Sequence, residues 1–371
     1  MKNLHGLIFA HSANDRLREL TQHRAVSSIP FGGRYRVIDF MLSNMVNAGI
    51  TDVGVVMRDN YQSLLDHLGS GKDWDLARKR GGLRLLPPFG LHESQEGGVF
   101  RGKMEALARI SSYLGFIRQD YVCLADGDIV VNLPIEKAFE DHLRTGADIT
   151  CVCTPRQVGA PETARYICFN ENREVTNIVI GRAEAGCYES LGVYIMSKRF
   201  LENATSYCSD HRLYSFERDV LQRRLGDAKI FVFPFESYAA RLQSNAKYFH
   251  HSIELLTAEV RNRLFLRDRP IRTKVRDETS TYYGQESAVS NSIVADGCII
   301  EGTVEDSVLF RGVYVGPGAV VKNSILMQDT RVLDNAKTNY AIADKGVLIK
   351  KKGVLMGQAS HPVVISKGEE V

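Results

Sequence analysis

Two aspartates and a group of arginines are the residues of this sequence whose types and spacing could support chemistry. Asp126 and Asp128 follow the apolar run 121–125, where a strand would end. Carboxylates are the ligands that Mg²⁺ prefers, although an aspartate at a strand end can equally serve a turn. Guanidinium groups pair with phosphate through two parallel hydrogen bonds, so a basic stretch can bind an anion or be a solvated loop. One short stretch carries three of them, Arg24, Arg34 and Arg36.

Alternating strand and helix patterns in the first half of the chain would position these residues. Apolar runs of strand length occupy residues 4–10, 52–57, 121–125 and 149–154. A helix is expected from Asp39 to the stop signal at Gly49, and another over residues 135–144. Strand, helix and strand at this spacing predict βαβ units, whose ligands bind beyond the carboxyl ends of the strands.

The pattern changes from about residue 285. Residues 290–320 place small and β-branched side chains every four to six positions, with glycines between them. Such spacing predicts a parallel β-helix, and a β-sandwich of short strands is the alternative. We therefore expect an α/β domain over 1–245, a helical and charged junction over 246–284, and a β-helix over 285–371.

Composition restricts the class of protein. The 371 residues are 44% hydrophobic with a net charge of +3, which is typical of a globular protein and offers no excess of basic residues for nucleic acid. No apolar run approaches the ~20 residues that span a bilayer, and the N-terminus lacks the layout of a signal peptide. Seven cysteines, mostly inside apolar runs, are expected to be reduced core thiols. We expect a cytoplasmic protein with no nucleic-acid or membrane partner.

The block FGGRYRVIDF at residues 31–40 resembles the N-terminal signature of the bacterial ADP-glucose pyrophosphorylase (glucose-1-phosphate adenylyltransferase) family. Further matches follow in the order of that family: Leu42 to Asn44, residues 47–50, Arg101 with Gly102, and residues 189–194. The resemblance implies a Rossmann-like nucleotidyltransferase domain with a mixed sheet, a left-handed β-helix, a tetramer and a role in glycogen biosynthesis. It also implies that Arg16, Gly102 and Ser190 stand at substrate-contacting positions. It further implies an effector anion site at Arg24, Arg34 and Arg36.

Three departures from active members concern the same active site. Their glycine-rich phosphate loop reads AHSANDR here at residues 10–16, and their Glu-Lys-Pro segment has no counterpart between Asn172 and Cys187. Their second metal-binding aspartate corresponds to Arg241, a cation that cannot coordinate Mg²⁺. Asp128 keeps the position of the first, with Asp126 as a substitute ligand. We expect no catalytic residues and no tightly bound cofactor, with Mg²⁺ only if the site is active.

These observations leave two functional hypotheses. The first is a regulatory or structural subunit, similar to the non-catalytic D-type (GlgD-type) subunit, which joins a catalytic subunit in a hetero-tetramer or forms a homo-oligomer and binds phosphate or a sugar phosphate. The alternative is an active sugar-phosphate nucleotidyltransferase with a non-standard metal site built on Asp128. A β-helix acyltransferase would need a histidine in the coils, and residues 285–350 contain none.

Overall fold

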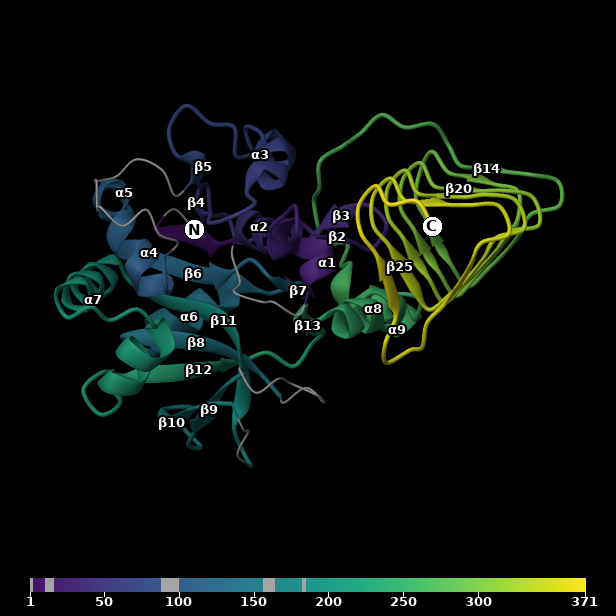
Figure 1. The fold of residues 1–371 in the computed structure, drawn as a ribbon. Helices are drawn as coiled ribbons and strands as arrows, with labels where there is room; N and C mark the ends of the chain where they lie inside the picture. The colour runs from purple at the N-terminus through teal and green to yellow at the C-terminus, as the bar shows by residue number, and fades with distance from the viewer. Residues whose placement is uncertain (1–2, 11–16, 88–99, 156–163, 182–184) are drawn as a thin grey trace.

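The protein consists of an α/β domain and a β-helix, with two helices between them (Figure 1). The computed structural model describes residues 3–10, 17–87, 100–155, 164–181 and 185–371. Within these ranges, no helix combines the length and the apolar character that crossing a membrane requires.

A nine-stranded mixed sheet forms the first domain. Its main order is β10-β9-β11-β6-β1-β4-β5, while β8 pairs with β11 and with β12. Strand β1 is parallel to β4 and β6, whereas β11 is antiparallel to β6. The bounds are β1 Leu4–Phe9, β4 Asp52–Val56, β5 Gly82–Leu86, β6 Tyr121–Asp126, β8 Ile149–Thr154, β9 Arg165–Phe169, β10 Val175–Ile180, β11 Tyr188–Ser197 and β12 Ile230–Pro234. The predicted α/β fold with a mixed sheet is confirmed.

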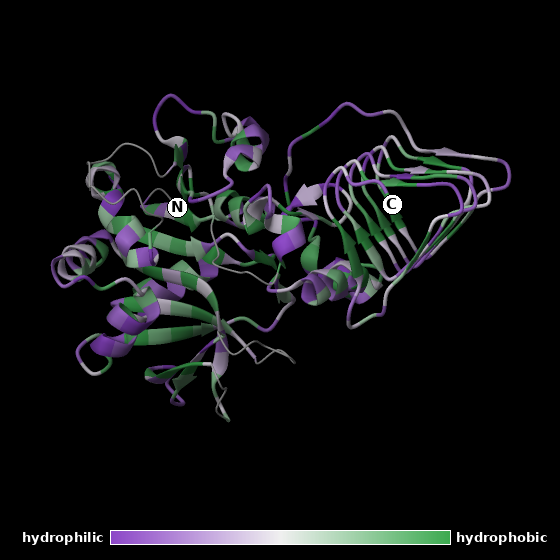
Figure 2. Cartoon of the chain, in the orientation of Figure 1, coloured by the Kyte–Doolittle hydropathy of each residue, from purple (hydrophilic) through white to green (hydrophobic). Residues whose placement is uncertain are grey.

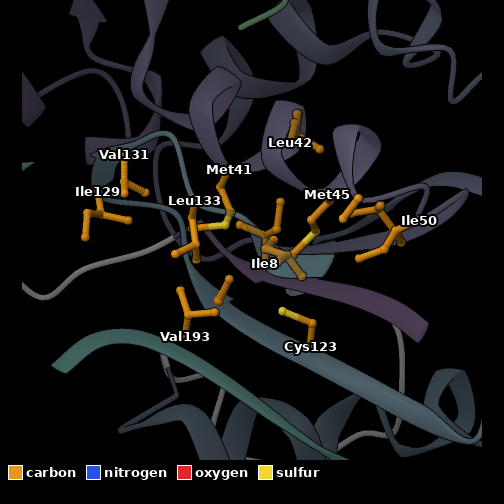
Figure 3. Packing of buried hydrophobic residues seen from close by; sticks show 14 of the residues in the cluster. Ile8, Met41, Leu42, Met45, Ile50, Cys123, Ile129, Val131, Leu133 and Val193 are labelled. Carbon is orange, nitrogen blue, oxygen red and sulfur yellow. The ribbon is translucent and has the colours of Figure 1, made fainter. Parts of the chain in front are cut away.

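Helix α2 packs on this sheet and shows how the sequence specifies the layer. It begins two residues before the expected Asp39, because the Oδ2 atom of Asp39 accepts the Arg36 backbone N–H at 2.9 Å from inside the first turn. Met41 and Met45 point toward β1 and β6 (Figure 3). The α-helices are α1 Arg18–Thr21, α2 Val37–Asn47, α3 Gln62–Leu68, α4 Lys103–Arg109, α5 Ser111–Phe116, α6 Ile135–Thr145, α7 Lys198–Asp210, α8 Asn245–Glu254 and α9 Ala258–Leu264.

Two small pairs of strands lie outside the main sheet and matter for the sites below. Strand β7 (Ile129–Val131) pairs antiparallel with β13 (Ala239–Arg241). Strands β2 (Pro30–Phe31) and β3 (Tyr35–Arg36) form a hairpin whose tip holds Gly32 and Gly33 at positive φ. A side chain on Gly33 would approach Ile293 of the β-helix to 3.2 Å, so the hairpin tip rests against the second domain.

The second domain is a parallel β-helix of three five-stranded sheets, which excludes the β-sandwich. Hydrophobic residues follow its strands, and hydrophilic ones gather at many of its corners (Figure 2). The first sheet contains β14 Tyr282–Tyr283, β17 Ile299–Ile300, β20 Tyr314–Val315, β23 Arg331–Val332 and β26 Leu348–Ile349. The second contains β15 Ala288–Ser290, β18 Thr303–Glu305, β21 Val320–Lys322, β24 Lys337–Asn339 and β27 Val354–Met356. The third contains β16 Ile293–Val294, β19 Val308–Leu309, β22 Ile325–Leu326, β25 Ala341–Ala343 and β28 Val363–Ile365.

Stacked polar residues fix the coils of this β-helix. The buried hydroxyl of Ser307 accepts the backbone N–H of Ser324 at 3.0 Å, and the hydroxyl of Ser324 accepts that of Ala341 at 3.3 Å. At the neighbouring corner Asp306 and Asn323 adopt positive φ, which their short polar side chains tolerate better than most. The near-hexad spacing of small residues in the sequence arises because the chain turns at these corners at regular intervals.

The expectation that all seven cysteines are reduced thiols is wrong. Cys168 and Cys187 form a disulfide. Strand β11 pairs antiparallel with β9, with Tyr188 opposite Ile167, and this register brings the two cysteines face to face. Their separation of 19 residues gave no sign of that pairing in the sequence. The other five are free and buried, as expected: Cys123, Cys151, Cys153, Cys208 and Cys298.

Candidate functional site

The carboxyl end of the central strand β6 carries the two aspartates that the sequence singled out. Asp126 ends β6 and Asp128 precedes β7, and both are buried, with 6% and 7% of their surface exposed. The intervening Gly127 donates its backbone N–H to the Phe9 carbonyl of β1 at 2.8 Å, which holds the turn against the sheet. The two carboxylates therefore face the edge where ligands of such sheets bind.

Arg241 fills the space between these carboxylates. The pairing of β13 with β7 sets Arg241 opposite Ile129, directly after Asp128. Its Nη1 atom lies 2.5 Å from Asp128 Oδ1 and 3.2 Å from Asp126 Oδ2. Its Nη2 atom donates to the Leu191 carbonyl at 2.8 Å. The guanidinium thus bridges both candidate metal ligands.

A third carboxylate and two further cations complete the cluster. Lys103 Nζ lies 2.8 Å from Asp126 Oδ1 and 2.9 Å from Glu217 Oε1. Arg165 Nη1 lies 3.1 Å from Asp126 Oδ2 and 3.1 Å from Glu217 Oε1. Three cations therefore meet three carboxylates, and we call these six residues the ion cluster: Lys103, Asp126, Asp128, Arg165, Glu217 and Arg241.

The charges of the ion cluster stabilise one another. Burial alone would raise the pKa of Asp126, but Lys103, Arg165 and Arg241 together lower it well below the usual range of an aspartate. Burial alone would also raise the pKa of Glu217, but the charges of Lys103 and Arg165 outweigh that effect, and the pKa is lowered. Asp126 and Glu217 are thus positioned as anions that already have cationic partners. Gly192 permits this packing, because a Cβ there would come within 2.1 Å of Asp126 Oδ2.

This geometry bears on the metal chemistry that the aspartates could support. Mg²⁺ requires several oxygen ligands in a nearly octahedral arrangement. Of the carboxylates described at this strand end, Asp126 and Asp128 both bind Arg241, and an ion could reach them only by displacing that guanidinium. The residues present do not fit Mg²⁺ as they stand.

Gly102 and Ser190, two of the positions expected to contact substrate, are packed against or hydrogen-bonded to other residues of the protein. Gly102 lies beneath Tyr214, and a Cβ on it would come within 2.3 Å of the Tyr214 carbonyl oxygen. Ser190 is buried; its hydroxyl lies 3.1 Å from the Tyr194 hydroxyl and accepts the Gly192 N–H at 3.1 Å. Arg16 and the loop 11–16 lie outside the described residues.

A cavity of about 40 Å³ lies where the β2-β3 hairpin, the segment after α9 and the β-helix meet. This is room for about three water molecules. Six of its lining residues are cationic, and the lining described includes no carboxylate. We call it the basic pocket and its cations are Arg34, Arg36, Lys274, Arg276, Arg311 and Lys345.

The cations of the basic pocket lie close enough to destabilise one another's charged forms. Burial, followed by nearby cations that include Arg36 and Arg24, lowers the pKa of Lys345 to about 7. Arg311 is 8% exposed, and its Nε and Nη2 atoms are buried with no hydrogen-bond partner among the described residues. Burial, together with Arg34 and Arg276, lowers the pKa of Arg311, and Asp296 and Glu278 offset this only in part. Buried donors without partners are rare and costly, and the basic pocket offers such donors beside several cations.

The three arginines predicted to form the anion site separate in the structure. Arg34 and Arg36 line the basic pocket, and Arg36 Nη1 also donates to Ser28 Oγ at 2.7 Å. Arg24 is not part of the lining: its guanidinium is buried against Asp344 of the β-helix in an ion pair between the domains.

Sequence reasoning missed most partners of both clusters. Arg165 and Glu217 reach the ion cluster from β9 and from a helical turn at Phe216–Leu221, far from any motif. A lysine at a helix start, such as Lys103, is commonly solvated, yet its side chain is 11% exposed. One signal was available for the pocket: Arg311 interrupts the apolar run 308–310 with a charge.

Comparisons with known proteins agree with this architecture. Residues 5–238 match the family "Nucleotidyl transferase", and residues 275–361 match "GlmU-like, C-terminal hexapeptide", which identifies the coil as the left-handed β-helix. The glycogen biosynthesis protein GlgD of Bacillus subtilis (strain 168) is 36% identical over 98% of this chain and 95% of its own length. A protein of the same name from Geobacillus stearothermophilus is 36% identical over 85% of this chain and 82% of its own.

Relatives named as enzymes match as well. The glucose-1-phosphate adenylyltransferase of Geobacillus stearothermophilus is 34% identical over 85% of this chain and 82% of its own length. That of Clostridium perfringens (strain SM101 / Type A) is 29% identical over 100% and 96%. The chain therefore belongs to the glucose-1-phosphate adenylyltransferase family, among relatives that include the GlgD proteins of glycogen biosynthesis.

Proposed function

We propose that this chain is a regulatory or structural subunit of glucose-1-phosphate adenylyltransferase in glycogen biosynthesis, and that its own site does not perform the chemistry. The observation that carries the proposal is Arg241, whose guanidinium bridges Asp126 and Asp128. Joining ATP to glucose 1-phosphate needs Mg²⁺ to neutralise phosphate charge, and a resident arginine cannot replace an ion that must bind two substrates.

The expected loss of rate is large. Removing one electrostatic contribution to a transition state typically costs about 10²–10³ in rate. Here the metal ligand is replaced, and the glycines of the phosphate loop are absent from residues 10–16. In the same proposal the protein is cytoplasmic, holds no tight cofactor, and joins a catalytic subunit in a hetero-tetramer or forms a homo-oligomer.

The basic pocket would give such a subunit its regulatory role. An anion there would contact the hairpin through Arg36, the connecting segment through Arg276 and the β-helix through Arg311. Because these come from both domains, the bound anion would favour one relative position of the domains. Allosteric coupling of this kind is typically about 1–3 kcal/mol. Phosphate or a sugar phosphate has the required chemistry.

The activity test compares three samples. ADP-glucose formation with Mg²⁺ is measured for the pure chain, for a catalytic paralogue, and for the two together, with an EDTA blank. We expect the chain alone to be at least ~10³-fold slower than the catalytic subunit, and the mixture to form one larger species. A turnover close to that of the catalytic subunit would instead establish the alternative, an active nucleotidyltransferase with a non-standard metal site on Asp128.

The regulatory test uses Arg311→Met in the mixed complex, with Arg331→Met as the matched control. Arg331 is an exposed β-helix arginine outside the pocket lining. Activity is titrated with fructose 1,6-bisphosphate, phosphate and phosphoenolpyruvate. We expect Arg311→Met to shift at least one curve tenfold or more while Arg331→Met shifts none. Unchanged activation and inhibition curves in both variants would show that the basic pocket has no regulatory role.

A further inference from the structure

Two adjacent histidines and a glutamate converge on one side of α8. His250 Nε2 lies 3.0 Å from Glu254 Oε1, and His251 Nδ1 lies 2.8 Å from Glu254 Oε2. All three ligand atoms lie within 4.8 Å of one another. The residues stand at i, i+1 and i+4 of one helix, and neighbours three and four apart on a helix share a face.

We propose that His250, His251 and Glu254 form a binding site for a transition-metal ion of the Zn²⁺ class. Zinc binds imidazole nitrogen and carboxylate oxygen at about 2.0–2.2 Å, which sets tetrahedral ligands about 3.3 Å apart. The observed distances of 2.8 Å and 3.0 Å run to the two different oxygens of Glu254, and one ligand atom from each residue lies within 4.8 Å of the others, so side-chain rotations would have to bring the three to that value. Imidazole ligands favour zinc, copper and nickel over Mg²⁺, so this site is distinct from the magnesium chemistry of the family.

The surroundings of the cluster suit a metal. Tyr238 donates its hydroxyl to Glu254 Oε2 at 3.0 Å and lies 3.4 Å from His251 Nδ1. Such an outer hydrogen bond orients a ligand. His250 is 60% exposed on its side chain, which gives an ion a path from solvent.

The position of the site gives the ion a mechanical role. Tyr238 immediately precedes β13, which carries Arg241. On the other side, α8 places Phe249 against Tyr340 of the β-helix, with ring centroids 6.0 Å apart. Helix α8 lies between the two domains in Figure 1. An ion here would fix the helix at the junction between the ion cluster and the β-helix.

The test uses tag-free, full-length protein stripped with EDTA. Co²⁺ is titrated and followed by its visible absorption, which is intense for four-coordinate sites, and Zn²⁺ is titrated by calorimetry, with Mg²⁺ as a control ion. We expect one Co²⁺ or Zn²⁺ per chain and no Mg²⁺ at this site.

Variants assign the ligands. His250→Ala and Glu254→Gln should each weaken Zn²⁺ binding more than about 100-fold, and Tyr238→Phe about 10–100-fold. His361→Ala removes an exposed histidine elsewhere and should change nothing. Because His250 is exposed, its variant should fold and lose only the metal-dependent rise in melting temperature. Absence of stoichiometric binding, or equal affinity in wild type and His250→Ala, would overturn the proposal. The activity of the mixed complex is a separate measurement, so either proposal can fail alone.

Discussion

Replacing Arg241 by methionine tests whether the ion cluster holds the nucleotidyltransferase domain together. Methionine keeps much of the length of the side chain and removes only the charge and its hydrogen bonds. Asp126 retains Lys103 and Arg165, but Asp128 has no other ion-pair partner among the described residues. The cluster passes from three cations and three carboxylates to an excess of one buried negative charge.

The magnitude follows from that imbalance. Removing one partner of a buried ion pair typically costs about 3–5 kcal/mol. The variant also leaves the Leu191 carbonyl without its 2.8 Å donor. With a urea m-value of about 2–3 kcal/mol/M, the midpoint of unfolding should fall by about 1–2 M.

Trp74 supplies the assay. It is the single tryptophan of the sequence, is fully buried, and belongs to the same hydrophobic cluster as Ala125 of β6. Its fluorescence therefore follows unfolding of this domain without a signal from the β-helix. Urea titrations at neutral pH compare wild type, Arg241→Met and Arg263→Met, whose exposed ion pair with Glu259 should matter by less than about 1 kcal/mol.

A double variant separates charge from packing. If the buried charge causes the loss, Asp128→Asn should recover more than about 1 kcal/mol when added to Arg241→Met, because the unpaired carboxylate is gone. A fall in midpoint no larger than that of Arg263→Met would refute the reasoning, and would mean that water or a solution cation replaces the guanidinium freely.

Three further predictions concern charge and covalent state. Since anion binding favours protonated Lys345, whose pKa is about 7, sulfate should bind more tightly as pH falls from about 8.5 to 6.5; calorimetry on wild type and Lys345→Met checks this, and a slope that persists in the variant would contradict it. Because the pKa values of Asp126 and Glu217 are lowered on folding, their stabilisation is complete above about pH 4 and is lost as pH falls further; Trp74 fluorescence should show acid unfolding below that pH, and constant stability there would argue against an ionised cluster. Intact mass should rise by about 2 Da on reduction in wild type but not in Cys168→Ser, and thiol titration of unreduced protein that finds all seven cysteines free would disprove the disulfide.

The sequence predicted most of the helices and strands, but it predicted few of the residues that form the ion cluster. A continuous apolar run predicted β6, because a strand covered on both faces is apolar throughout, and the near-hexad spacing predicted the β-helix. The position of Asp128 at the end of β6 was visible in the family pattern, and so was Arg241 in place of the second aspartate. Arg165 could not be found in this way, since a charged residue at the start of a strand looks the same whether it faces solvent or a buried carboxylate.

Contacts between residues far apart in the sequence also determine which arginines line the basic pocket and which form an ion pair. Arg24, Arg34 and Arg36 look alike in the sequence, but only the fold places Asp344 beside Arg24. Residues that line the basic pocket are up to 315 positions apart, from Pro30 to Lys345. Local composition holds no information on such neighbours, because they are set by how the β-helix docks on the hairpin.

The excess charge of the basic pocket has a consequence for how the protein behaves in any solution. A confined group of cations with no carboxylate in its described lining attracts small anions, and screening over a Debye length of ~10 Å at 0.1 M salt leaves that attraction intact inside the pocket. Chloride, sulfate or buffer phosphate would therefore compete with any physiological ligand. If the proposed effector binds there, its apparent affinity would depend on the medium as much as on the protein, and measurements in phosphate buffer would report exchange of one anion for another.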